Sequence, residues 1–353
     1  MINVFVLTLV SCSFSNNAKP QQPEEDDGSV VLPDEAAETQ DADPGQAETE
    51  ETDTVISDTD PVEEPDETPD AEPEIPEEEK IKSVVIGTYN THLFFDKICD
   101  SGNCSSSDFE QEPNASEYSE KVNELAESVK EIAADIILMQ EIEKESCLKD
   151  LFEKSGDYDE FYLGEKGSNA SVDTGVMTKG KITYKNKHTE QIECAECDGG
   201  KTTFSHTFLE VHITLGGREI IVFSAHFKSK ADDDASRRLA ESAAAAKILK
   251  NTAKKYPKAL IVMGGDLNDE PGSDTLEPFE SDPAFLRVAD ELSTKNQATY
   301  SYRGDAIAID HIFWVKTDSG EYKKGSAEVV KDAPSWYSLG SSDHAALKAT
   351  FEF

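Results

Sequence analysis

The sequence has little positive charge for its size. Lysine and arginine together number 33 among 353 residues, against 73 aspartates and glutamates, and the formal net charge is -40. This balance argues against a broad basic groove that binds nucleic acid without regard to sequence. It does not exclude a nuclease, because a bound divalent metal ion can supply positive charge locally.

A long apolar run is also missing. The apolar stretch at residues 3–10 is far too short to span a bilayer. It runs into Leu9-Val10-Ser11-Cys12, which resembles a bacterial lipobox, where a cysteine after small residues becomes the lipidated start of the mature protein. No basic residue precedes the stretch, so either the true start lies upstream or Cys12 is a coincidence. We favour lipidation of Cys12 and assign residues 1–12 to a lipoprotein-type signal segment.

Aromatic residues are nearly absent from residues 13–80, which are rich in Pro, Glu, Asp, Thr and Ala. Residues 1–80 carry 25 acidic residues and two basic ones, Lys19 and Lys80. Such a segment cannot bury enough apolar surface to offset chain entropy, so it is predicted to be disordered. Like charges and prolines favour an extended linker. The segment is either a spacer that holds a domain off a membrane or passive low-complexity sequence.

Composition changes at about residue 81, and residues 81–353 are enough for one domain with a substantial core. A buried strand is predicted at Ser83–Asn90, a helix over 118–134 with Ser119 as its N-cap, and a strand over 136–141. Strand, helix and strand form a parallel crossover. Asn90 and Glu141, at the two strand ends, should therefore lie side by side.

The rest of the domain is predicted to contain many strands and few helices. Gly216-Gly217 marks a hairpin. Helices are expected near 145–154 and 234–254, and strands near 158–163, 174–178, 182–187, 207–214, 219–225, 259–264, 309–315 and 345–353. This pattern, in two similar halves, predicts an α/β fold of two packed sheets covered by helices on the outside.

Several apolar runs end in polar residues. After the apolar run 259–262, two glycines allow a tight turn, and Asp266 and Asn268 follow two residues apart, so that they share a face. A carboxylate and a carboxamide at a strand end suit an oxyanion or a metal, although both are also ordinary turn residues. The same kind of break recurs on separate segments, at Asn90, Glu141, His226, Asp310, Asp343 and His344.

These strand ends lie in stretches that together resemble the endonuclease/exonuclease/phosphatase superfamily, with its deoxyribonuclease I-like fold. The resemblance covers about residues 83–353 and implies a four-layer α/β/β/α sandwich in which the strand ends form one cleft. It also implies a metal-dependent hydrolase of phosphodiester bonds. The matching stretches, in the superfamily's order, are Gly87-Thr88-Tyr89-Asn90, Met139-Gln140-Glu141, Ser224-Ala225-His226-Phe227-Lys228-Ser229, Gly265-Asp266-Leu267-Asn268, Ile309-Asp310-His311-Ile312 and Ser342-Asp343-His344.

Phosphate ester hydrolysis needs an activated water, neutralised phosphoryl charge and help for the leaving oxygen. Glu141 is a hard oxygen ligand suited to Mg²⁺ or Mn²⁺, and Asn90 would add a neutral oxygen or orient the phosphate. His344 is the expected general base, with Asp310 fixing its tautomer.

The remaining roles follow from position or from the resemblance. Asp266 and Asn268 would orient water and phosphate, and Asp266 would also contact a metal. His226 would bond phosphoryl oxygens or assist the leaving group. The resemblance makes Asp343 a second metal ligand. The expected cofactor is Mg²⁺ or Mn²⁺, with Ca²⁺ as an optional structural ion.

Four other histidines are interpreted as structural: His188, His206, His212 and His311, with His206 the least clear of them. His212 alternates with Glu210 within a strand and is predicted to face solvent. His206 lies near the place where relatives often carry an arginine that contacts phosphate.

Five cysteines remain if Cys12 is lipidated. In an exported protein, Cys99 with Cys104 and Cys194 with Cys197 would form short local disulfides, leaving Cys147 over. A zinc site on the two pairs is the alternative, although their spacing is not a standard four-cysteine pattern. The Cys-x-x-Cys loop resembles a small disulfide loop of secreted deoxyribonucleases.

The substrate is predicted to be DNA or RNA. The segment Thr299–Gly304, followed by Ile309-Asp310-His311, is similar to bacterial secreted nucleases. We therefore expect an exported, surface-anchored or secreted endonuclease that is a monomer without an obligate protein partner. Sphingomyelinase-type or inositol-phosphate phosphoesterase activity is the alternative. A catalytically inactive surface binding protein is the third interpretation.

Overall fold

The computed structural model describes residues 76–105, 108–167, 171–232, 234–333 and 337–353, which belong to one unit spanning Asp70–Phe353. Cys12 and nearly all of the predicted linker lie outside the described residues, so these assignments and the boundary near residue 80 stay predictions. Within the described ranges, no helix is both long and apolar enough to cross a membrane.

The first half of the fold is the predicted crossover. Strand β1 (Ser83–Phe94), helix α1 (Ala115–Ile132) and strand β2 (Ile136–Ile142) follow one another, and β1 pairs with β2 in parallel. The predicted N-cap Ser119 is wrong. Asn114 caps α1 instead, because its side chain accepts from the amide of Glu117, whose carboxylate returns to the amide of Asn114. This reciprocal capping box begins the helix one turn before its apolar periodicity.

The second half repeats the arrangement. Strand β9 (Arg218–His226), helix α3 (Ala235–Lys255) and strand β10 (Leu260–Asp266) form another parallel crossover. Strand β14 (Asp310–Val315) pairs antiparallel with β10, as strand β17 (Ala346–Glu352) does with β1.

The strands form two large sheets. The first has the order β15 (Glu321–Tyr322), β17, β1, β2, β4 (Asp173–Thr178), β3 (Glu160–Leu163), with β16 (Glu328–Val330) also on β17. The second has the order β11 (Phe285–Arg287), β14, β10, β9, β8 (Phe208–Leu215), β5 (Lys181–His188).

Shorter elements lie outside the two large sheets. Two small hairpins are β6 (Ile192–Glu193) with β7 (Lys201–Thr202), and β12 (Tyr300–Tyr302) with β13 (Asp305–Ile307). The other helices are α2 (Glu145–Ser155), α4 (Glu277–Glu280) and α5 (Thr294–Gln297). Short 3₁₀ segments lie at Glu77–Glu79, Asp198–Gly200, Lys230–Asp232 and Val288–Glu291.

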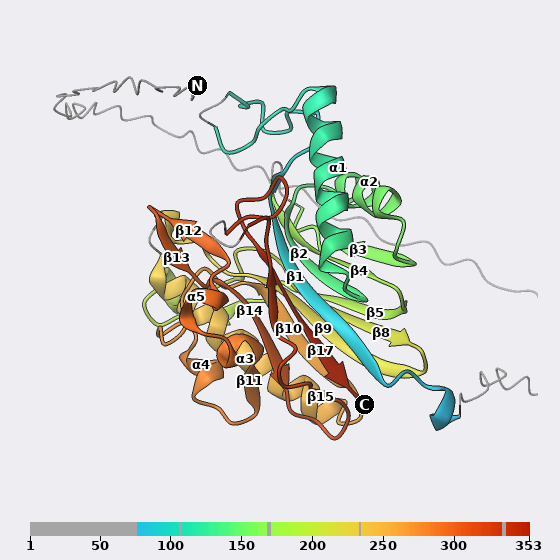
Figure 1. The fold of residues 1–353 in the computed structure, drawn as a ribbon. Coiled ribbons are helices and arrows are strands. Elements are labelled where there is room, and N and C mark those ends of the chain that lie inside the picture. Colours follow the sequence, from blue (N-terminus) through green and yellow to red (C-terminus); the bar gives the residue numbers. More distant parts are fainter. Residues whose placement is uncertain (1–75, 106–107, 168–170, 233, 334–336) are drawn as a thin grey trace, which may run out of the picture. The chain divides into compact units, whose positions relative to one another are not determined.

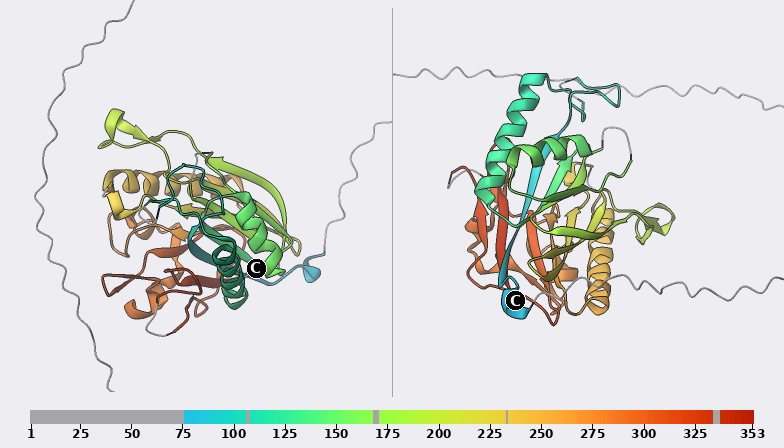
Figure 2. Two further views of the ribbon diagram at one scale, coloured as in Figure 1. Left: turned by 90° about the horizontal axis from the view of Figure 1, so that it is seen from above. Right: turned by 90° about the vertical axis from the view of Figure 1, so that its right-hand side faces the viewer.

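Figures 1 and 2 show helices packed on the outer faces of the two sheets. Three apolar clusters hold these layers together. One joins α1 and α2 to the first sheet, through residues such as Leu125, Leu148 and Met139. A second joins α3 to the other sheet, and a third fills the space between the sheets. The molecule is therefore a four-layer α/β/β/α sandwich, as predicted.

Close packing at the end of β10 requires glycine. A Cβ atom on Gly265 would lie 1.9 Å from the carbonyl oxygen of Ala225 on β9, and one on Gly264 would lie 2.9 Å from Leu138 of the facing sheet. These two glycines let β10 approach both neighbours, which brings Asp266 level with His226 and Asp310.

The predicted exposure of His212 is wrong. Its side chain is buried, and its Nε2 lies 2.8 Å from Oε1 of Glu210. The ring of Tyr256, just after α3, packs edge-on against it at 4.8 Å. The alternation along the strand correctly placed His212 on the same face of the sheet as Glu210. That face is not exposed, because the end of α3 covers it.

Candidate active site

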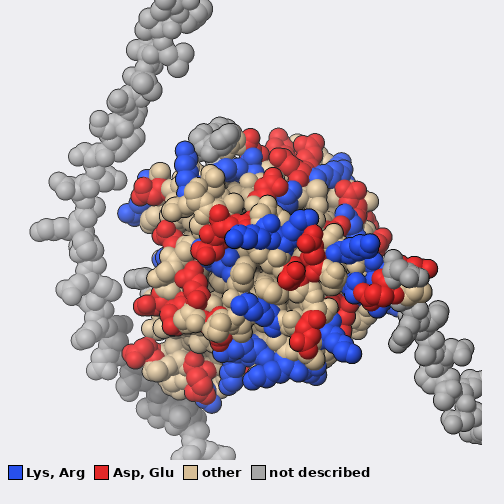
Figure 3. All heavy atoms as spheres, turned by 60° about the horizontal axis from the view of Figure 1, so that its bottom comes forward, with Lys and Arg blue, Asp and Glu red and all other residues tan. Residues whose placement is uncertain are grey.

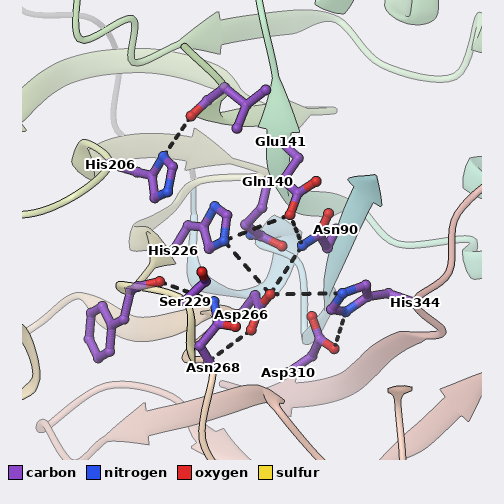
Figure 4. Close-up of polar contacts among 12 residues, drawn as sticks. Asn90, Gln140, Glu141, His206, His226, Ser229, Asp266, Asn268, Asp310 and His344 are labelled. Atoms are coloured by element: carbon purple, nitrogen blue, oxygen red, sulfur yellow. Dashed lines mark hydrogen bonds and ion pairs between the residues drawn. The ribbon is translucent and has the colours of Figure 1, made fainter. Parts of the chain in front are cut away.

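The polar strand ends meet at one edge of the sandwich (Figure 4). The first sheet contributes Asn90 from β1 and Glu141 from β2, and the second contributes His226, Asp266 and Asp310 from β9, β10 and β14. In the second sheet, Asp266 pairs in register with both His226 and Asp310. His344 lies in the turn before β17. Sequence reasoning had predicted all of these positions.

Residues with a strained backbone conformation cluster at this edge. Of the six described non-glycine residues with positive φ, four lie here: His92, Leu93, Glu141 and Asn268. Glu141 has φ 64°, and its Oε2 accepts a 2.8 Å hydrogen bond from the amide of Leu93. Residues are held in this region of φ/ψ space at a cost and only where their surroundings impose it, and such residues concentrate at functional sites.

The two central carboxylates share one donor. The Nδ2 of Asn90 donates to Oε1 of Glu141 at 3.0 Å and to Oδ2 of Asp266 at 3.1 Å. The Nε2 of His226 lies 3.9 Å and 3.8 Å from the same two oxygens. Ligand atoms of Glu141, His226 and Asp266 all lie within 4.8 Å of one another. Two carboxylates and an imidazole at this spacing fit a divalent cation such as Mg²⁺ or Mn²⁺.

Burial makes this negative charge costly without a cation. Asp266 is only 2% exposed. Burial, followed by the neighbouring Asp310, raises the pKa of its carboxyl group well above the usual range. A divalent cation bound at this point would offset both effects, so the residues present fit the metal dependence that the fold implies.

Asp343 lies apart from this group. Its side chain is 42% exposed at the rim, and its Oδ1 is 3.0 Å from Nδ1 of His92 and 3.9 Å from Nε2 of His344. Asn268 lies closer to the central carboxylates than Asp343 does. Its backbone amide donates to Oδ1 of Asp266 at 2.8 Å, and its side-chain Nδ2 donates to the carbonyl of Phe227 at 3.1 Å. A role for Asp343 as metal ligand stays a prediction.

His344 and Asp310 form a buried pair. The Nδ1 of His344 lies 2.8 Å from Oδ2 of Asp310, which leaves Nε2 facing the site, 3.9 Å from Oδ2 of Asp266. Burial opposes the imidazolium, but the charges of Asp310, Asp266 and Asp343 outweigh it and raise the pKa of His344 to about 10. Without a cation, His344 is therefore protonated at neutral pH.

We predict that His344 stays protonated past pH 8 in the metal-free protein. Adding Mg²⁺ should lower its pKa, because positive charge near Glu141 and Asp266 weakens the negative field that holds the proton. NMR titration of the histidine ring protons with and without MgCl₂ measures both values. An unchanged His344 pKa in saturating MgCl₂ would mean that the cation binds elsewhere.

A second histidine supports His226. The rings of His206 and His226 stack at 4.0 Å and 6° between their planes, and Nδ1 of His206 lies 2.7 Å from the carbonyl oxygen of Val172. Burial, then the charge of His344, lowers the pKa of His226 to about 3. Burial also lowers the pKa of His206, so both rings are neutral at pH 7. His206 thus packs against the site, and its interpretation as a structural histidine stays a prediction.

Two further charged side chains hold the surrounding loops. Glu241 of α3 is fully buried and accepts 2.6 Å hydrogen bonds from the amides of Ser205 and Lys228, the residues next to His206 and close to His226. The Nζ of Lys121 donates at 2.8 Å to the carbonyls of His92 and Ser341. Sequence reasoning missed both. An acid on the buried face of an alanine-rich helix was the available signal for Glu241.

Comparison with known proteins identifies the family. The model of the Endonuclease/Exonuclease/phosphatase family matches residues 85–337. The chain belongs to this family. A search of curated proteins gave no match.

Solved structures of the family share the fold. The mannosyl-6-phosphatase of Bacteroides thetaiotaomicron VPI-5482 has a TM-score of 0.55 and 16% identity, over 76% of this chain and 100% of that one. TDP2 of D. rerio, complexed with a single strand DNA product, has a TM-score of 0.53 and 13% identity, over 77% and 99%. A family member from Bacteroides vulgatus has a TM-score of 0.53 and 15% identity, over 77% and 100%. The chain thus has the fold of metal-dependent phosphoesterases.

Proposed function

We propose that the protein is a divalent-metal-dependent phosphodiesterase that cleaves nucleic acid outside the cytoplasm. One observation carries the catalytic part: the Asp310–His344 pair lies across from Glu141, with Asp266 between them. A cation-binding carboxylate pair and a histidine oriented by a carboxylate are the two devices that hydrolysis of a phosphodiester needs.

Each residue has a defined part in this proposal. When bound at Glu141 and Asp266, a divalent cation supplies positive charge to the phosphoryl oxygens. His344 presents Nε2 to the site and moves a proton there, while Asp310 fixes the other ring nitrogen. Neutral His226, supported by His206, hydrogen-bonds a phosphoryl oxygen or the leaving oxygen.

The preference for nucleic acid rests on the β12–β13 hairpin beside His344. The ring of Tyr300 lies 4.8 Å from the ring of His344. At the tip, Tyr302 is 52% exposed, and the guanidinium of Arg303 lies over its ring at 5.0 Å. An exposed aromatic ring can stack on a base, and an arginine can bind the adjacent phosphate. A small phosphate ester would not reach this tip.

In this proposal, nucleic acid is bound at the hairpin and the cation site, and not across the whole surface. The face shown in Figure 3 mixes Lys and Arg with Asp and Glu. Mixed charge of this kind gives no field of one sign to attract a polyanion. In this proposal, the hairpin and the cation site supply the contacts with nucleic acid.

Shortening Tyr302 or Arg303 to alanine should lower kcat/KM on a single-stranded oligonucleotide by about 10-fold each, because a stacked base or a phosphate contact is lost. On bis(p-nitrophenyl) phosphate, which is too small to reach the tip, both variants should match the wild type. Tyr184→Ala, which removes an equally exposed tyrosine (50%) from β5, is the matched control. Equal losses on both substrates would contradict binding at the hairpin.

We also propose export and anchoring at the cell surface through Cys12. The two pairs Cys99–Cys104 and Cys194–Cys197 are disulfide-bonded, and Cys147 is free and buried. Disulfides persist in oxidising compartments, which supports an extracytoplasmic location. Metabolic labelling with a radioactive fatty acid, in cells that express the wild type or Cys12→Ala, tests the anchor. Label in both proteins, or in neither, would contradict it.

A substrate panel tests the function. Plasmid DNA, RNA, sphingomyelin and a phosphoinositide are incubated with the protein in MgCl₂ or EDTA, in parallel with His344→Ala. We expect Mg²⁺-dependent cleavage of DNA or RNA by the wild type. Turnover of sphingomyelin or the phosphoinositide alone would replace the nuclease proposal, and no turnover at all would favour the surface binding protein.

A further inference from the structure

A second group of carboxylates lies away from the strand-end cluster, where the loop after β1 meets the end of β2. Oxygen atoms of Asp100, Glu110 and Glu143 lie within 4.8 Å of one another. Asp96 adjoins them through Lys144, whose Nζ is 2.8 Å from Oδ2 of Asp96 and 2.6 Å from Oδ2 of Asp100.

Two of these acids are almost completely buried. Glu110 is 1% exposed and Glu143 is 4% exposed. The carboxylate of Glu110 accepts from the amides of Asp100 at 2.6 Å and Ser101 at 2.7 Å, and Oε2 of Glu143 accepts from the amide of Asp96 at 2.7 Å. The loop is therefore folded around the carboxylates, and the Cys99–Cys104 disulfide closes the same loop.

One buried carboxylate oxygen of this cluster has no hydrogen-bond partner among the described residues. This atom is Oε1 of Glu143, and a carboxylate oxygen of Glu143 lies within 4.8 Å of ligand atoms of Asp100 and Glu110. The nearby ammonium of Lys144 lies 4.0 Å from it, too far for a hydrogen bond, because Asp96 and Asp100 hold that ammonium. Three carboxylates thus share one lysine, and Glu110 lies beside them. A buried carboxylate oxygen without a partner is expensive unless a cation or a proton is bound to it.

We propose that Asp100, Glu110 and Glu143 bind a structural Ca²⁺ ion, separate from the catalytic cation. Ca²⁺ takes carboxylate oxygens from an irregular loop and tolerates variable geometry, whereas Mg²⁺ requires a nearly ideal octahedron. The ion fastens the disulfide-closed loop to the end of β2, two residues after Glu141. This site does not depend on the catalytic proposal.

Calcium titration calorimetry on the oxidised full chain tests the site. Glu141→Gln weakens the catalytic site, and this variant should still bind one Ca²⁺ ion. Glu143→Gln should weaken that binding at least 10-fold. Glu112→Gln is the matched control, since Glu112 is an exposed acid that follows Glu110 by two residues, and it should bind as the wild type does.

Thermal unfolding gives a second readout. Saturating CaCl₂ should raise the Tm of the wild type and of Glu141→Gln by roughly 5 °C, because the ion binds the folded state. Glu143→Gln should lose this rise, and its Tm in EDTA should equal or exceed that of the wild type, because a buried unpaired charge is gone. The proposal is overturned if Glu141→Gln binds no Ca²⁺ at about 10 mM, above the range of weak extracellular sites. Wild-type affinity in Glu143→Gln would overturn it as well.

Discussion

Replacing His344 with alanine is expected to lower kcat on bis(p-nitrophenyl) phosphate by about 10³-fold, the usual range for loss of a positioned acid–base group. Nε2 of His344 is the nitrogen that Asp310 leaves facing the site. Asp310→Asn should cost about 10²-fold, because an amide can still bond the ring but no longer favours its charged form. Steady-state kinetics in saturating MgCl₂ measures both losses.

The same His344→Ala protein should bind Mn²⁺ at least as tightly as the wild type, because Glu141 and Asp266 remain in place and a positive charge that opposes the cation is gone. Retained binding would separate a role in proton transfer from a role in metal binding. Activity within about fivefold of the wild type would remove His344 from the chemistry, since acid–base catalysis contributes far more than that.

Replacing Glu141 with glutamine is expected to weaken Mn²⁺ binding by about 10²-fold and to abolish activity at low metal concentration. The substitution keeps the side chain's shape but removes the charge that faces Asp266 and His226. Raising the MnCl₂ concentration should restore part of the activity. Titration of Mn²⁺ followed by electron paramagnetic resonance measures the affinity directly.

Glu145→Gln is the matched control for this variant, because Glu145 is an exposed acid four residues further along the chain. It should bind Mn²⁺ and turn over substrate as the wild type does. Equal affinity for Mn²⁺ in Glu141→Gln and the wild type would place the cation elsewhere.

Parallel strand pairing made much of the site predictable. Asn90 and Glu141 end two strands of one crossover, so their proximity follows from the order strand, helix, strand. The second crossover places His226 beside Asp266 by the same rule. Polar residues at the ends of apolar runs thus identified the edge of each sheet, and the family resemblance joined the two edges into one site.

Contacts between loops were not predictable in this way. The positive φ of Glu141 depends on the amide of Leu93, which approaches from another strand. The stack of His206 on His226 depends on Glu241, which lies on a helix and holds both loops. Burial of His212 likewise depends on Tyr256 from beyond α3. Periodicity reports which face of a strand a residue occupies, but not which distant element covers that face.

The most direct test of the account is the rate of bis(p-nitrophenyl) phosphate hydrolysis by the wild-type protein in MgCl₂ and in EDTA. The proposed site predicts turnover in MgCl₂ that EDTA abolishes and that excess Mg²⁺ or Mn²⁺ restores. Turnover that persists in EDTA, or its absence with every divalent ion, would contradict a cation-dependent phosphodiesterase centred on Glu141, Asp266 and His344.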